Sequence, residues 1–444
     1  MASHPVNNSL SLDRSRGTLL TILTLALAFN YVDRQVFALV LQNIESDLHL
    51  SDSQLGFLSG LAFAVFYAVM GVPIARLADS GNRVTIIAVT TAIWSVFVML
   101  CGCAGSFTQL FLLRVGVAIG EAGCIPPAQS LLSDSFPKAQ RAKAFSIYTL
   151  GSPLSVILGG FVAGWINQYY GWRITFALLG FPGIPLAVLA WLLLKDSRTQ
   201  SANEVVHVRS AKPSSEAHSL WYVARSLAGN ATFRQLLIAH TILYFFIYGV
   251  VLQWQPTFFV RTHGFTTGEL GTWQVLIWSL LGTVGTYAGG AFVHRYIADD
   301  ERKQLRLISC NIAIFGALNV LVYLCTNRYA SLGLVALAAP FYSSVFGPLF
   351  AVNQSVVPES MRATAVAILF FFANLIGMGL GGFATGLLSD QLRPMFGTDS
   401  LRYTLLLLSP GFFWCALHFW LASRSVAADM ERLEPRWRVQ HGQS

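Results

Sequence analysis

Long apolar runs, separated by short polar segments, fill most of the chain between residues 17 and 423. We count twelve runs long enough to cross a bilayer as helices, which takes about 20 residues each. An all-α membrane protein is therefore expected, with both termini on the same side of the membrane. The expected spans are 17–41, 54–78, 83–104, 107–131, 142–166, 173–194, 233–260, 269–293, 305–325, 330–353, 363–388 and 402–423.

The longest polar segment divides the spans into two groups of six. We expect residues 1–194 to form an N-terminal six-helix half and residues 233–424 a C-terminal half. Residues 195–232 are expected to be a cytoplasmic linker, in which "SLWYVARSL" can form a short helix at the membrane surface. Residues 425–444 are expected to be a cytoplasmic tail.

The two halves carry a matching segment. The fourth span is followed by "FPKAQRAKA" and the tenth by "VPESMRATA", with Pro137 and Pro358 at the same place in each. Arg141 and Arg362 follow these prolines by four residues. A repeat of half the chain in a twelve-helix protein predicts pseudo-symmetric halves that alternate access to a site between them.

Composition and charge agree with a membrane protein. Apolar residues make up 54% of the 444 and charged residues only 11%, where soluble domains average about 25% charged. Most of the 29 Lys and Arg lie in the N-terminus, the even-numbered loops and the tail, which predicts that these are cytoplasmic. The net charge of +8 therefore indicates orientation, not nucleic-acid binding. The six Cys lie in apolar segments without metal-ligand spacing, so we expect no metal site.

Four charges lie inside the expected spans: Asp33 and Arg34 in the first, Arg114 and Glu121 in the fourth. A charge at bilayer depth costs roughly 2.5–3.5 kcal/mol on insertion scales. Arg114 and Glu121 share a helix face because their spacing of seven residues is close to two turns. The four charges sum to zero, so we infer one network in which Arg34 bridges to Glu121.

This network has a functional and a structural interpretation. Buried ionisable groups in helix bundles usually mark ion or substrate paths, although ion pairs can also simply hold helices together. The C-terminal spans contain no charged residue in their interiors. This asymmetry favours a proton-handling N-terminal half, with Asp33, beside the fixed charge of Arg34, as proton carrier. Glu121 is the second candidate for proton coupling.

Several motifs together resemble one family. They are "YVDRQ" in the first span, "GVPIARLADSGNRVTI" after the second, "RVGVAIGEAG" in the fourth, "FPKAQRAKAFSIYTLGSPLS" and "GWRITFALLGFPG". With these motifs the chain resembles transporters of the major facilitator superfamily and, within it, the Spinster-like group. The resemblance covers nearly the whole chain and implies the major facilitator fold.

The resemblance also implies a cytoplasmic gate. Asp79 and Arg83 carry the loop signature, in which Asp79 can cap a neighbouring helix or pair with Arg83. Ser80 departs from this signature, which usually has Arg there, so a weaker latch is expected. We assign Arg141 and Arg362, in the repeated loops, to the same gate.

A central cavity is the expected substrate site, with the four charges near its floor. Its other candidate residues are polar or amphipathic groups in apolar spans. They are Tyr31, Tyr148, Tyr244, Tyr248, Gln253, Trp254 and Asn374.

The leading functional hypothesis is a proton-coupled secondary transporter. The resemblance implies lysophospholipid- or sphingolipid-like amphipaths as substrates. One alternative is a transporter of small organic anions such as carboxylates, since "NYVDR" also occurs in anion–cation symporters of this superfamily and Arg suits a carboxylate. A non-transporting membrane sensor is a further alternative. We find no nucleophile, phosphate or dinucleotide motif, so we expect neither an enzyme nor a cofactor. A monomer among membrane lipids, in a bacterial inner membrane, is expected.

Overall fold

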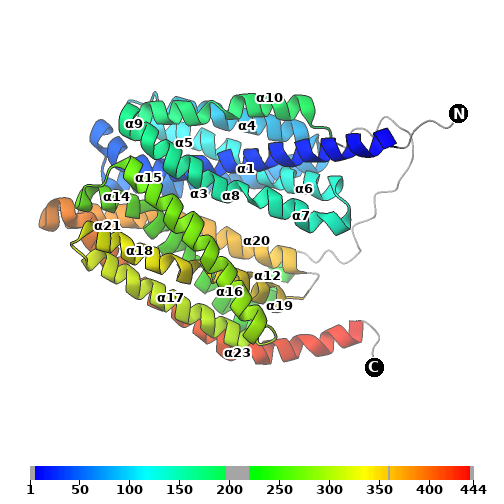
Figure 1. Ribbon diagram of the computed structural model, residues 1–444. Coiled ribbons are helices and arrows are strands. Elements are labelled where there is room, and N and C mark those ends of the chain that lie inside the picture. The colour runs from blue at the N-terminus through cyan, green and yellow to red at the C-terminus, as the bar shows by residue number, and fades with distance from the viewer. Residues whose placement is uncertain (1–5, 197–219, 359–360, 441–444) are drawn as a thin grey trace. The chain divides into compact units, whose positions relative to one another are not determined.

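The computed structural model describes residues 6–196, 220–358 and 361–440, and the secondary structure of these residues is helical throughout (Figure 1). The helices of the first part of the chain are α1 (Val6–Leu48), α2 (Asp52–Gly56), η1 (Phe57–Leu61), α3 (Ala62–Ser80), α4 (Arg83–Cys101), α5 (Phe107–Ala122), α6 (Ile125–Ser135), α7 (Lys138–Thr149), α8 (Gly151–Val156), η2 (Ile157–Val162), α9 (Ala163–Gly180) and α10 (Gly183–Leu193). Those of the second part are α12 (Leu220–Gly229), α13 (Ala231–Tyr244), η3 (Phe245–Val251), α14 (Leu252–His263), α15 (Thr267–Gln274), η4 (Val275–Leu281), α16 (Gly282–Tyr296), α17 (Glu301–Leu324), α18 (Arg328–Ser343), α19 (Phe346–Ser355), α20 (Arg362–Phe372), η6 (Ala373–Gly379), α21 (Leu380–Phe396), η7 (Gly397–Asp399), α22 (Ser400–Leu408) and α23 (Gly411–Gln440).

Ten helical stretches of the described residues are long and apolar enough to cross a membrane. Two of them, Lys143–Leu193 with 51 residues and Thr364–Glu431 with 68, far exceed one crossing, since a bilayer core is about 30 Å thick and a helix rises 1.5 Å per residue. Each is interrupted at a glycine with positive φ, Gly171 at 79° and Gly397 at 58°. Each long stretch therefore holds two spans, which reconciles ten stretches with the twelve predicted spans.

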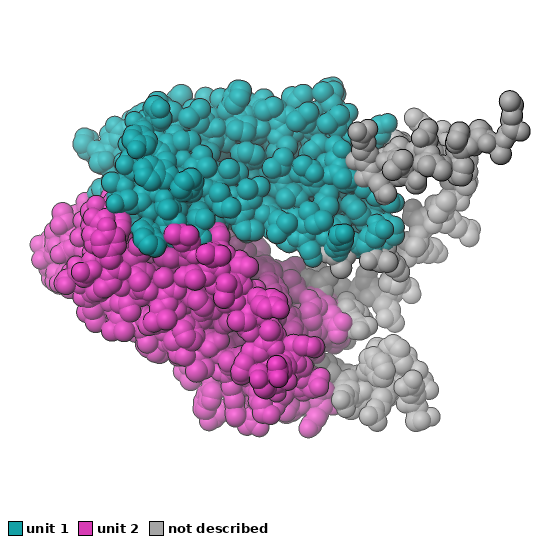
Figure 2. All heavy atoms as spheres, viewed as in Figure 1, with its two compact units in different colours: residues 1–50, 62–209, 266–275 teal, residues 51–61, 210–265, 276–444 magenta. Residues whose placement is uncertain are grey.

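The chain divides into two compact units, which Figure 2 shows in different colours. Unit 1 comprises residues 1–50, 62–209 and 266–275, and unit 2 comprises residues 51–61, 210–265 and 276–444. Each unit thus includes a short segment from the other half of the sequence: α2 and η1 belong to unit 2, and α15 belongs to unit 1.

These two exchanged segments begin in the same way. Ser51 accepts a hydrogen bond from the backbone N–H of Gln54, whose side chain accepts one from the backbone N–H of Ser51. Thr266 and Glu269 form the same reciprocal capping box at the start of α15. Capping boxes satisfy N–H groups that lack partners in the first turn. Both segments therefore carry their own signal for starting a helix.

Close backbone packing holds α2 in unit 2. A Cβ atom on Gly56 would lie 2.3 Å from the carbonyl oxygen of Gly382 in α21. No side chain fits at that distance, so glycine is required for this approach of two helices.

The predicted linker lies for most of its length, 197–219, outside the described residues. Its last part forms α12, where the sequence favoured a short helix. In the tail, α23 continues past residue 424 to Gln440. Asp429 in this extension accepts hydrogen bonds from the backbone N–H and the hydroxyl of Thr232, both at 2.8 Å. The tail helix therefore caps the start of α13.

Candidate functional site in unit 1

Asp33 of α1 and Arg114 of α5 form a buried ion pair. Oδ2 of Asp33 accepts a hydrogen bond from Nη1 of Arg114, and each residue is only 1% exposed. Either charge alone would be strongly destabilising in this environment, because its desolvation would not be compensated.

Arg34 of α1 and Glu121 of α5 form a second ion pair, the one inferred from the sequence. Nη2 and Nε of Arg34 donate to Oε2 of Glu121 at 3.0 and 3.2 Å. Glu121 is fully buried, whereas the side chain of Arg34 is 25% exposed. Asn30 adds a hydrogen bond from Nδ2 to the backbone oxygen of Glu121, at 3.3 Å. Arg34 is therefore the most accessible charge of the network.

Both carboxylates have unused hydrogen-bonding capacity. Among the described residues, Oδ1 of Asp33, Oε1 of Glu121 and Nε of Arg114 have no hydrogen-bond partner although they are buried. A proton added to Asp33 would leave Arg114 without its counter-charge. Glu121 lies on the same face of α5 as Arg114 and carries the second negative charge of the network.

The two tyrosines predicted in this half have different surroundings. The Tyr31 ring is half-buried, and its centroid lies 5.5 Å from the guanidinium carbon of Arg34. Tyr148 is 2% exposed within an apolar cluster, and its hydroxyl has no hydrogen-bond partner among the described residues. Tyr31 is therefore close to the charge network, whereas Tyr148 presents a buried, unused hydroxyl.

The other predicted cavity residues lie in unit 2. Tyr244 and Tyr248 are adjacent, with ring centroids 4.5 Å apart, and the Tyr244 ring also meets Phe370 edge-on at 6.1 Å. Asn374 donates from Nδ2 to the backbone oxygen of Phe370 at 2.8 Å, one turn earlier in the same helix. This group is therefore largely aromatic.

Gln253 and Trp254 lie where α14 packs on α21. Trp254 is fully buried and donates from Nε1 to the backbone oxygen of Gly382 at 3.1 Å. Gln253 is 6% exposed, and its Nε2 has no hydrogen-bond partner among the described residues. The structure thus gives the indole N–H of Trp254 a hydrogen-bond acceptor and leaves Gln253 with an unused donor.

At the predicted gate, Arg83 is fully buried and pairs with two acids that sequence reasoning missed. It donates to Asp196 at 2.6 Å through Nη2 and at 3.1 Å through Nε, and to Asp134 at 2.6 Å through Nη1. The side chain of Asp79 lies outside the described residues. The available signal for these partners was an acid just after the fourth expected span and another just after the sixth.

The repeated arginines both contact the end of the preceding helix, at different positions of the repeat. Nε of Arg141 donates to the backbone oxygen of Phe136 at 3.1 Å, and Nε of Arg362 donates to that of Gln354 at 2.9 Å. Each accepting oxygen lies at the C-terminal end of the preceding helix, where carbonyl groups lack helical partners. The repeat in sequence therefore corresponds to a repeated helix-end contact.

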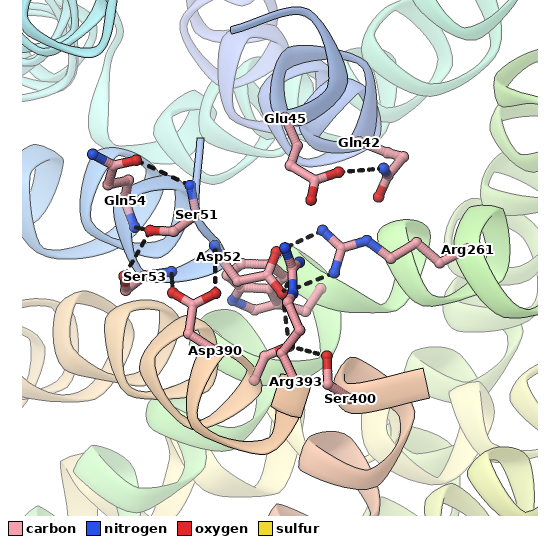
Figure 3. Close-up of polar contacts among 12 residues, drawn as sticks. Gln42, Glu45, Ser51, Asp52, Ser53, Gln54, Arg261, Asp390, Arg393 and Ser400 are labelled. Atoms are coloured by element: carbon pink, nitrogen blue, oxygen red, sulfur yellow. Dashed lines mark hydrogen bonds and ion pairs between the residues drawn. The ribbon is translucent and has the colours of Figure 1, made fainter. Parts of the chain in front are cut away.

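A second buried ionic cluster, in unit 2, was also missed (Figure 3). Arg261 donates to both oxygens of Asp52, at 2.5 and 2.8 Å. The Oδ2 atom of Asp52 also accepts hydrogen bonds from Ser389 at 2.6 Å and from Arg393 at 3.2 Å. Asp390 accepts from the backbone N–H groups of Asp52 and Ser53 at 3.0 and 2.8 Å. The sequence signal was limited to the helix-start pattern "SDSQ".

Comparison with known proteins places these observations in a family. The family model described as "Major Facilitator Superfamily" matches residues 23–382. An "MFS-type efflux pump" of Mycolicibacterium smegmatis is 31% identical over 413 residues, 92% of this chain and 93% of that protein. A "Hexuronate transporter" of Bacillus subtilis is 26% identical over 394 residues, 86% of this chain and 90% of that protein.

Solved structures of transporters also resemble this chain in fold. A bacterial homologue of the human lysosomal transporter Spinster, in an inward-facing and unoccupied conformation, has a TM-score of 0.82 and 27% identity. The match covers 96% of this chain and 99% of that one. The resemblance to the Spinster-like group and the expected all-helical transporter fold are thereby confirmed.

Proposed function

The chain belongs to the Major Facilitator Superfamily, and we propose that this multi-pass membrane transporter couples substrate movement to protons. The family match shows a secondary transporter and not an enzyme. Proton coupling is our proposal, and it rests on the two buried ion pairs of unit 1, Asp33 with Arg114 and Arg34 with Glu121.

The two pairs give proton binding a direct consequence. Neutralising Asp33 removes the counter-charge of Arg114, and a buried guanidinium without a counter-charge is strongly destabilised. The system then lowers its free energy by rearranging the remaining contacts around Glu121. We propose Asp33 as the proton carrier and Glu121 as the second titrating group. The pairing state thus reports whether a proton is bound.

For the substrate, we propose a lysophospholipid- or sphingolipid-like amphipath. The similarity to bacterial homologues of Spinster supports this class. Arg34, which is partly exposed, is suited to an anionic head group. The aromatic residues Tyr244 and Tyr248 of unit 2 are suited to an apolar tail. We propose that these groups, with Tyr31, Tyr148, Gln253, Trp254 and Asn374, line the cavity.

A small carboxylate is the second candidate substrate. The relative named as a hexuronate transporter supports it, and a guanidinium can bind a carboxylate through two parallel hydrogen bonds. This candidate also uses Arg34 but needs no apolar tail site.

We also propose the placement of the chain. The bacterial relatives support placement in an inner (plasma) membrane, and the distribution of Lys and Arg supports cytoplasmic positions for both termini. Two six-helix halves joined by residues 195–232 are proposed to work within one chain, as a monomer. Asp79, Arg83, Arg141 and Arg362 are proposed to act at the cytoplasmic gate.

The proposal is tested by uptake into proteoliposomes with an imposed pH gradient. Labelled lysophosphatidylcholine is compared with labelled glucuronate for the parent protein and for Asp33→Asn. We expect gradient-driven lysolipid uptake that falls at least tenfold in Asp33→Asn, because that variant cannot carry the proton. Full gradient-driven uptake by Asp33→Asn would contradict the role of Asp33.

Asp47→Asn is the matched control. Asp47 also pairs with an arginine, Arg173 at 2.9 Å, but both side chains are exposed, at 45% and 40%. The Asp47→Asn variant should therefore take up both probes at the rate of the parent protein. Gradient-driven uptake of glucuronate alone would support proton coupling but would replace the lysolipid class of substrate with small carboxylates. Uptake of neither probe would favour a substrate of a different class.

A further inference from the structure

One aromatic ring of α3 lies beside both arginines of the charge network. Phe63 is 1% exposed and lies in the first turn of α3, directly after the π-helical segment η1. Its ring centroid is 4.6 Å from the guanidinium carbon of Arg34 and 5.2 Å from that of Arg114. The two guanidinium groups belong to different helices, α1 and α5. Phe63 is therefore common to two ion pairs that share no residue.

Each arginine also has an aromatic neighbour of its own. The Phe37 ring lies 4.4 Å from Arg114, and the Tyr67 ring lies 5.1 Å from Arg34. Tyr67 is one turn beyond Phe63 on α3, and the two rings are stacked at 5.7 Å with an interplanar angle of 22°. The second expected span thus supplies an aromatic surface to a network whose charges come only from the first and fourth.

A shared ring has a specific physical effect. The negative face of an aromatic ring attracts a guanidinium, more strongly where water is excluded. Two guanidinium groups repel each other, so a ring that attracts both can hold both nearby without a further carboxylate. If one arginine loses its carboxylate and moves, its contact with the ring changes, and so does the position of the ring beneath the other arginine.

We propose that Phe63 is a positioning residue that couples the Asp33–Arg114 pair to the Arg34–Glu121 pair. This inference rests on the proposed proton-coupling function of the same four charges. It adds that α3 senses the pairing state through an aromatic contact and not through a charge. Phe63 carries no distinguishing pattern in the sequence, because one Phe in an apolar span is ordinary.

The test is a thermodynamic cycle on the purified full-length protein, with the thermal midpoint as readout. Asp33→Asn, Glu121→Gln and the double variant are each measured with Phe63 present and with Phe63→Leu. With Phe63 present, the shift in thermal midpoint of the double variant should differ from the sum of the shifts of Asp33→Asn and Glu121→Gln; we call this the coupling difference. In the Phe63→Leu background, the coupling difference should be at most half as large. The remainder is direct charge–charge interaction between the two pairs.

Two further variants separate positioning from packing. Phe63→Tyr keeps the ring and should restore the parental difference. Phe412→Leu removes an equally buried ring, 1% exposed, whose ring contacts Phe246 and Phe315 are uncharged. It should lower the midpoint without changing the difference. Phe63→Met replaces Phe63→Leu if the latter does not yield folded protein.

The proposal would be overturned if the double variant departed from the sum of the single shifts as much in the Phe63→Leu background as in the parent. It would also be overturned if Phe412→Leu reduced that departure as much as Phe63→Leu does. The cycle needs no substrate, so its outcome is separate from the transport assay. Full pH-driven uptake by Asp33→Asn would contradict the proton role while leaving a measured coupling through Phe63 intact.

Discussion

Two buried aspartates of this protein, Asp33 in unit 1 and Asp52 in unit 2, have very different contacts. Both oxygens of Asp52 accept hydrogen bonds, from Arg261, Ser389 and Arg393 together. Asp33 uses one oxygen, and the other has no partner among the described residues.

The difference separates a carboxylate whose hydrogen bonds are complete from one with an unused oxygen. A fully hydrogen-bonded carboxylate strongly favours its charged form, because each donor stabilises the anion. Asp52 joins three helices at their ends, where it fixes geometry. Asp33 lies in mid-helix, where its contact with Arg114 joins α1 to α5.

Chemistry also differs between the two units at buried helix positions. Unit 1 has the charged residues Asp33 and Arg34 in the middle of α1, whereas the segment "FIYGVV" of η3 in unit 2 ends in Val250 and Val251, which are 2% and 1% exposed.

The largest expected effect on stability comes from Asp52→Asn. This change leaves Arg261, whose side chain is 8% exposed, without its bidentate anion. We expect a loss of about 3–5 kcal/mol in the free energy of unfolding, as for other broken buried ion pairs. Denaturant titration of the protein in detergent measures it. The control Asp47→Asn breaks an exposed pair and should cost about 0–1 kcal/mol. Equal losses would mean that Asp52 is not a structural anchor.

An intermediate effect is expected when a charge is placed in the apolar half. Val250→Asp puts a carboxylate at a buried position of unit 2, 2% exposed, in spans with no charged residue in their interiors. We expect it to destabilise by roughly 2.5–3.5 kcal/mol, the cost of a charge at bilayer depth. Val250→Asn is the matched control, because it adds a polar group of the same shape without the charge. If the two variants were equally stable, the charge asymmetry between the halves would have no energetic basis.

The smallest expected effect is the loss of a helix cap beside Asp52. Asp390 accepts hydrogen bonds from two backbone N–H groups at the start of α2. Asp390→Ala should lower the free energy of unfolding by about 0.5–2 kcal/mol, the usual cost of losing a cap. Asp390→Asn keeps one acceptor oxygen and should lose less, in the same denaturant titration. A loss in Asp390→Ala as large as that of Asp52→Asn would show that the two acids act as one unit.

The residues that the sequence identified at the site are those with an unusual type for their environment. Asp33, Arg34, Arg114 and Glu121 were found because charges are rare in apolar spans, and the structure brings all four together. Phe63 was not found, because its residue type is ordinary in a membrane helix. Asp52 was not found for a related reason: an acid at a helix start is common and usually exposed.

The sequence by itself determined the membrane-spanning helices, the repeat and the four intramembrane charges. Each of these follows from local composition, since an apolar run must form a helix in lipid and a rare charge must face the protein interior. Only the tertiary structure decided that Arg114 pairs with Asp33, that Arg83 pairs with Asp134 and Asp196, and that α2 belongs to unit 2. Those outcomes depend on how each helix is rotated and how closely it packs on its neighbours, which residues far apart in the sequence determine together.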